Sequence, residues 1–138
     1  MLRVVLDTNV LVSAIISGGK PRDLLRKVIF KEFTLVTSEL ILREFGTVLR
    51  RPKFKTNENE IHRIILALMQ TAEVVKVISK LNLVEEDSKD NMVVETAYDG
   101  RADFIVSGDT HLLALKSYGK IKVVEVKEML SRLEEKTT

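Results

Sequence analysis

The chain contains no cysteine, two histidines and no long apolar run, and each of these features narrows the possible functions. Without cysteine there can be no disulfide and no thiolate metal site. A bound metal would therefore be held by oxygen atoms, by His62 or by His111. No segment is apolar enough to cross a bilayer, and no basic segment with a cleavage site begins the chain. We therefore expect a cytoplasmic protein without a membrane partner.

Length and composition favour one globular domain. The 138 residues are long enough to enclose a substantial core, and 45% of them are hydrophobic while 30% are charged. We expect a single domain over residues 1–138, in which residues 127–138 form a C-terminal helix and a polar tail. The net charge of +2 neither requires nor excludes a nucleic-acid partner.

Short apolar runs alternate with amphipathic segments along the chain. This alternation is typical of an α/β fold, in which a parallel sheet is covered by helices on both faces. The expected strands are residues 2–6, 33–37, 73–78, 103–107 and 121–126. The expected helices are residues 10–17, 22–31, 38–51, 58–72, 87–99, 110–116 and 127–135.

Two aspartates stand where an expected strand ends and a helix begins. Asp7 follows the first strand and Asp109 follows the fourth. In open α/β sheets, ligands bind beyond the carboxyl ends of the strands. If the first and fourth strands are neighbours, both carboxylates leave the sheet at the same edge. Taken alone, Asp7 could equally be a simple helix cap.

A third carboxylate, Glu44, belongs to the helix expected at residues 38–51. At about 100° per residue it falls inside the apolar arc of that helix, between Leu40 and Val48. An unpaired carboxylate on a core-facing stripe is costly, so Glu44 should face a polar pocket or a cation. The alternative is that Glu44 lies at the margin of the stripe and reaches solvent.

A fourth carboxylate, Asp90, lies in the first turn of a later helix. Val93 and Ala97 fall within about 60° of it, whereas Glu95 and Asp99 point the opposite way. Asp90 is therefore in line with the buried face. Its place near the helix N-terminus also favours a negative charge.

Four carboxylates in one pocket repel one another, and a divalent cation would remove that conflict. Oxygen ligands without cysteine select Mg²⁺ or Mn²⁺ rather than zinc. Such a site suits phosphodiester hydrolysis, because a bound metal lowers the pKa of water and stabilises the leaving oxygen. His111 follows Asp109 by two positions and could approach the site, although a histidine in a first helical turn is ordinarily solvated.

The most basic run of the chain is residues 50–55. If the site acts on a polyanion, this run is well placed to hold phosphates. Its candidate substrate-binding residues are Arg51, Lys53 and Lys55. Most basic runs of this kind are simply solvated.

The four acids belong to an ordered set of motifs. These motifs are residues 7–14 (DTNVLVSA), Glu44, residues 51–54 (RPKF), residues 87–91 (DSKDN) and residues 102–109 (ADFIVSGD). Together they resemble the PIN-domain family, and most closely the VapC-like toxin ribonucleases of toxin–antitoxin systems. The resemblance covers nearly the whole chain, from Val4 to about Val124. No single acid in it is specific, but the ordered set with its neighbours is a strong signal.

This resemblance implies a three-layer α/β/α domain with a five-stranded parallel sheet and a ribonuclease site that depends on Mg²⁺ or Mn²⁺. The acidic quartet of the family, which is both catalytic and metal-binding, corresponds here to Asp7, Glu44, Asp90 and Asp109. The residues that would orient ligands and water by hydrogen bonds are Thr8, Asn9 and Ser107, and Asp87 would reach a metal through water. The resemblance also implies an RNA substrate, a homodimer and, for the toxins, a protein antitoxin.

Other interpretations fit the sequence less well. A HAD-type phosphatase would need a second aspartate where Asn9 stands. A Mg²⁺-binding receiver-type signalling domain would need a phosphoacceptor aspartate after the third strand, where residues 78–80 read Ile-Ser-Lys. A catalytically silent PIN-like module that only binds RNA stays open.

Overall fold

The structure is a computed structural model that describes residues 1–81 and 88–137. In these ranges a six-stranded sheet has the order β3-β2-β1-β4-β6-β5. The central strand β1 is flanked by β2 and β4, so both of its edges are hydrogen-bonded. The strands are β1 Arg3–Leu6, β2 Thr34–Ser38, β3 Glu73–Val75, β4 Phe104–Val106, β5 Ser117–Tyr118 and β6 Ile121–Val124.

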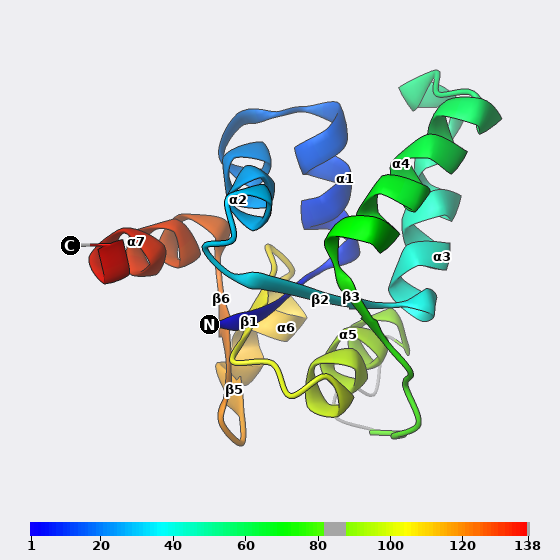
Figure 1. The fold of residues 1–138 in the computed structure, drawn as a ribbon. Coiled ribbons are helices and arrows are strands. Elements are labelled where there is room, and N and C mark those ends of the chain that lie inside the picture. Colours follow the sequence, from blue (N-terminus) through cyan, green and yellow to red (C-terminus); the bar gives the residue numbers. More distant parts are fainter. Residues whose placement is uncertain (82–87, 138) are drawn as a thin grey trace.

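Helices cover both faces of this sheet and form the outer two layers of the fold. Figure 1 shows α1 and α2 on one side of β1 and β2, and α5 on the other side. The C-terminal helix α7 packs against α2. The helices are α1 Thr8–Ile16, α2 Gly19–Ile29, α3 Glu39–Leu49, the 3-10 turn η1 Pro52–Phe54, α4 Glu58–Thr71, α5 Ser88–Asp99, α6 Thr110–Leu115 and α7 Val126–Thr137.

The expected parallel sheet is confirmed, with one addition. Five strands pair in parallel, whereas β5 pairs antiparallel to β6, opposite Ile121 and Lys122. No local sequence pattern predicts a strand at β5. Two residues are too few to show an alternating pattern, and this strand forms only because the chain turns back beside β6.

The third strand is shorter than expected, since it ends at Val75 rather than at residue 78. Beyond it, the backbone N–H groups of Ile78 and Ser79 donate to a carboxylate oxygen of Asp99, at 2.8 and 2.9 Å. The N–H of Leu81 donates to Glu95 in the same way, at 2.7 Å. Side chains of α5 thus replace a strand partner for this segment, which no local pattern of residues 73–78 could reveal.

β1 and β4 pair inside the core, and this pairing determines which residues emerge together at the carboxyl edge of the sheet. Val5 of β1 and Ile105 of β4 are fully buried and lie opposite each other in the ladder. The register continues with Leu6 opposite Val106, so the residues after them, Asp7 and Ser107, emerge side by side at the carboxyl edge.

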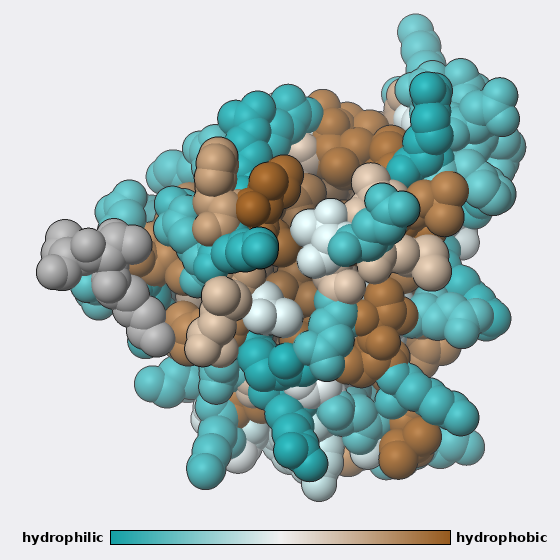
Figure 2. All heavy atoms as spheres, viewed as in Figure 1, coloured by the Kyte–Doolittle hydropathy of each residue, from teal (hydrophilic) through white to brown (hydrophobic). Residues whose placement is uncertain are grey.

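The surface in Figure 2 is largely hydrophilic, with smaller apolar areas between charged side chains. Among the helices that the structure describes, none combines the length and the apolar character needed to span a membrane.

Candidate active site

Four carboxylates from four different elements line one small pocket of about 220 Å³. One follows β1, one lies in the middle of α3, one lies in the first turn of α5 and one precedes α6. Each element delivers its side chain to the same edge of the sheet. The lining residues are Asp7, Thr8, Asn9, Glu44, Val48, Arg51, Asp90 and Asp109.

A serine ties two of these acids together. The Ser107 hydroxyl donates to Asp7 Oδ2 at 2.6 Å, and the backbone N–H of Asp109 donates to Ser107 Oγ at 2.9 Å. Ser107 is fully buried, so this short chain of hydrogen bonds is shielded from solvent. The orientation of the Asp7 carboxylate and the position of the Asp109 backbone are therefore coupled through one side chain.

Asp7 occupies the N-cap position of α1, where its side chain makes no capping hydrogen bond of standard geometry. Burial raises the pKa of the Asp7 carboxyl, and the nearby charge of Asp109 acts in the same direction. The hydrogen bond from Ser107 and the backbone N–H groups of Asn9 and Thr8 oppose this shift without cancelling it. Ionisation of Asp7 in this pocket is therefore unfavourable in free energy, and a bound cation would offset that cost.

Asp109, in contrast, caps a helix. Its Oδ1 atom accepts from the backbone N–H groups of His111 and Leu112, at 2.8 and 3.2 Å. These bonds hold the carboxylate in one orientation at the start of α6. Carboxylate oxygens of Asp90 and Asp109 and a ring nitrogen of His111 all lie within 4.8 Å of one another.

The two helical acids are placed by the apolar faces of their helices. Glu44 is half-buried and lines the pocket with Val48, which lies one turn further along α3. Asp90 is 5% exposed and lies on the same side of α5 as the fully buried Val94. Packing of each helix against the sheet thus turns its carboxylate toward the pocket.

The state of the Thr8 hydroxyl is evidence on whether this pocket suits a cation. Thr8 is 5% exposed and lines the pocket, yet its hydroxyl has no hydrogen-bond partner among the described residues. Leaving a buried hydroxyl unsatisfied costs about 1–3 kcal/mol. A hydrated cation in the pocket would satisfy it, and a donor set composed of oxygens fits a hard divalent ion.

Of the three basic residues expected to bind substrate, Arg51 lines the pocket. The described lining does not include Lys53 or Lys55. The Lys53 ammonium lies 5.0 Å from the centre of the Phe54 ring, and Lys55 ends η1 with a φ of 51°. Asn9 lines the pocket, whereas Asp87 lies outside the described residues.

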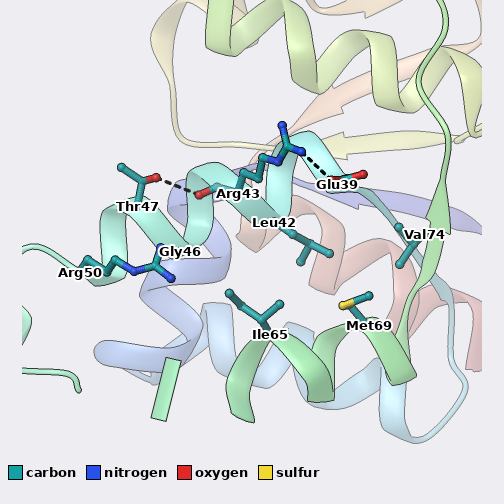
Figure 3. A pocket seen from close by; sticks show the side chains of 9 residues that line it. All are labelled: Glu39, Leu42, Arg43, Gly46, Thr47, Arg50, Ile65, Met69 and Val74. Atoms are coloured by element: carbon teal, nitrogen blue, oxygen red, sulfur yellow. Dashed lines mark hydrogen bonds and ion pairs between the residues drawn. The ribbon is translucent and has the colours of Figure 1, made fainter. Parts of the chain in front are cut away.

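A larger pocket of about 550 Å³ lies between α3 and α4 (Figure 3). Its floor is apolar, with Leu42, Ile65 and Met69 converging from the two helices. Its single described carboxylate, Glu39, is paired with Arg43 at 2.7 Å. This pocket has no cluster of acids, so size alone does not identify the site of chemistry.

The chain belongs to the PIN-domain family, because the PIN domain model matches residues 3–111. The resemblance noted from the motifs is thereby confirmed. The uncharacterized protein MJ1680 of Methanocaldococcus jannaschii is 30% identical over 145 residues, which cover 96% of this chain and 92% of that protein.

Two solved structures share the fold. One is VapBC2 from Rickettsia felis bound to a DNA fragment from their promoter, with a TM-score of 0.63, 15% identity and coverage of 88% of this chain and 97% of that chain. The other is PAE2754 from Pyrobaculum aerophilum, with a TM-score of 0.65, 17% identity and coverage of 97% and 90%. At these identities the likeness concerns the fold alone.

Val48 is a lining residue that was not among the predicted site residues. Its position four residues after Glu44 was a usable signal, because side chains spaced by four residues share a helix face. No spacing in the sequence shows that Arg50 and Arg51 line different pockets. Arg50 donates to Glu58 at 2.6 Å and lines the larger pocket, whereas Arg51 lines the acidic one.

Proposed function

We propose that this protein is an endoribonuclease that depends on Mg²⁺ or Mn²⁺. In this proposal Asp7, Glu44, Asp90 and Asp109 hold the cation. The supporting observation is that four carboxylates and one arginine, from segments far apart in the chain, line a single pocket. That combination joins negative charge for a metal with positive charge for a phosphate.

A bound divalent cation would act as a Lewis acid on the scissile phosphate and would lower the pKa of the attacking water. The protein's own residues have the remaining tasks. Arg51 would bind a phosphate oxygen of the substrate and limit the repulsion between RNA and the acids. Ser107 would hold Asp7 in the orientation in which its second oxygen faces the ion.

The proposal is tested by incubating the purified chain with end-labelled RNA in Mg²⁺, Mn²⁺ or EDTA. We expect cleavage only with metal, and its loss in Asp7→Asn and Asp90→Asn by at least about 100-fold. The matched control is Asp23→Asn, which removes an exposed carboxylate on α2 outside the pocket and should retain the wild-type rate. Cleavage that persists in EDTA or in Asp7→Asn would refute the proposal. Metal-dependent RNA binding without cleavage would instead identify a silent binding module.

We further propose that the enzyme is the toxin of a toxin–antitoxin pair, acts in the cytoplasm and works as a homodimer. Two observations support the toxin role: membership of the PIN-domain family and a fold shared with a chain of the VapBC2 structure. A small protein encoded beside this gene should copurify with the chain and inhibit its RNA cleavage. Light scattering of the purified chain should give twice the mass of 15.7 kDa. A monomer mass or an uninhibited enzyme would refute the respective part.

A further inference from the structure

His111 stands beside the acidic pocket, although the expected acidic quartet does not include it. It lies in the first turn of α6 and is exposed. One ring nitrogen lies within 4.8 Å of carboxylate oxygens of both Asp90 and Asp109. The chain has one other histidine, His62, and among the described residues His62 belongs to no such cluster.

We propose that His111 is a nitrogen ligand of the ion held by Asp90 and Asp109, and that it makes the site prefer first-row transition-metal ions such as Mn²⁺ over Mg²⁺. This inference rests on the proposed metal-dependent function and deepens it. Mg²⁺ prefers oxygen ligands and keeps much of its water, whereas imidazole binds well to transition-metal ions. A single nitrogen ligand among oxygen ligands therefore favours a transition-metal ion over Mg²⁺.

The separations are close to those that one ion requires. Ligand atoms of one ion with bonds of about 2.1 Å are about 3.0 Å apart when adjacent and about 4.2 Å apart when opposite. The three donor atoms lie at most 4.8 Å from one another, so each needs to move by less than about 1 Å to reach a common ion. An exposed histidine in a short helix can make that movement at little cost by a change of side-chain torsion.

The backbone around His111 is already fixed with respect to the neighbouring acid. The His111 N–H donates to Asp109 Oδ1 at 2.8 Å, so the carboxylate and the imidazole leave the chain from one hydrogen-bonded turn. This bond occupies one oxygen of Asp109 and leaves Oδ2 for the ion.

A separate observation in the acidic pocket also points to a ligand. The buried Thr8 hydroxyl lines the pocket and lacks a hydrogen-bond partner among the described residues. A water molecule on an ion held by Asp90, Asp109 and His111 would supply that partner. The unsatisfied hydroxyl and two of the three donors, Asp90 and Asp109, thus line the same pocket.

The test uses the metal ions alone, on the full chain. Electron spin-echo modulation of bound Mn²⁺ detects a coordinated nitrogen directly, and calorimetric titrations give the affinities for Mn²⁺ and Mg²⁺. In the wild type we expect a nitrogen signal and tighter Mn²⁺ binding. His111→Asn should lose the signal and bind Mn²⁺ about 10–100-fold more weakly, with a smaller change for Mg²⁺. The matched variant His62→Asn, which changes an exposed histidine on α4, should behave as wild type.

Three results would overturn the inference. A wild-type Mn²⁺ complex without a nitrogen signal would remove His111 from the site but would leave an all-oxygen metal centre and the proposed function intact. A nitrogen signal that persists in His111→Asn would also remove it. Binding of neither Mn²⁺ nor Mg²⁺ to the wild type would overturn both the ligand and the metal-dependent function. Circular dichroism confirms in each case that the variant is folded.

Discussion

Ser107 and Asp7 meet across neighbouring parallel strands, where the serine hydroxyl donates to the carboxylate over 2.6 Å. The two residues are 100 positions apart in the chain, and the bond exists because β1 and β4 end at the same edge of the sheet. Since Ser107 also accepts from the Asp109 backbone, it positions two of the four acids at once.

We therefore expect Ser107→Ala to weaken metal binding by about 10–100-fold while the chain stays folded, because Asp7 loses the group that orients it. Titration calorimetry with Mn²⁺ measures the affinity. Ser131→Ala, which alters an exposed serine of α7, is the control and should bind as wild type. An unchanged affinity in Ser107→Ala would show that this bond has no role in holding the ion.

Asp90→Asn should separate metal binding from folding. In the wild type, Mg²⁺ or Mn²⁺ at about 100 times its dissociation constant should stabilise the fold by about 2.7 kcal/mol, because it binds only the folded state. For a chain of this size that is a rise in Tm of roughly 10 °C. Asp90→Asn should lose this rise, and without metal it should be as stable as the wild type or more so, because it reduces repulsion among carboxylates. Thermal unfolding with and without metal decides the matter, and an equal metal-induced rise in both proteins would exclude Asp90 as a ligand.

The raised pKa of Asp7 gives the metal-free protein a defined pH dependence. At low pH Asp7 is protonated in both states, so it contributes no difference. As pH rises past its ordinary pKa of 3.8, the unfolded chain ionises first, and the folded state loses stability until its own raised pKa is passed. Above that pH the loss is constant. Asp7→Asn should remove this fall, and so gain stability relative to wild type toward neutral pH.

Urea unfolding in EDTA at a series of pH values measures this difference. Asp23→Asn, which changes an exposed carboxylate, should follow the wild-type curve. If the wild-type and Asp7→Asn curves stay parallel from pH 3.5 to 7.5, burial does not disfavour the ionised form of Asp7.

Arg51 should bind phosphate rather than maintain the fold. We expect Arg51→Ala to raise KM for RNA and to reduce the slope of binding affinity against salt by about one ion, with little change in Tm. Arg63→Ala is the matched control, because Arg63 is an exposed arginine of α4 outside the pocket. Fluorescence anisotropy with labelled RNA at several salt concentrations gives the slope. Equal slopes for the two variants would exclude contact between Arg51 and phosphate.

Local periodicity predicted the alternation of strands and helices, because each buried face leaves a repeat in the sequence. It also separated Asp90 from Glu95 and Asp99 on α5. In the structure Glu95 and Asp99 accept backbone hydrogen bonds from residues 78–81, away from the pocket. Such faces follow from the geometry of one helix, so a single sequence is enough to assign them.

Local sequence patterns are enough to predict the parallel α/β architecture and the places of Asp7, Glu44, Asp90 and Asp109 on their own elements. The packing of the elements is needed to show that Arg51 lines the acidic pocket while Arg50 pairs with Glu58, and that residues 117–118 add an antiparallel strand. The two kinds of feature depend on interactions of different range along the chain. Periodicity within an element depends on neighbours a few residues away, whereas a pocket depends on how separate elements pack, which local spacing does not encode.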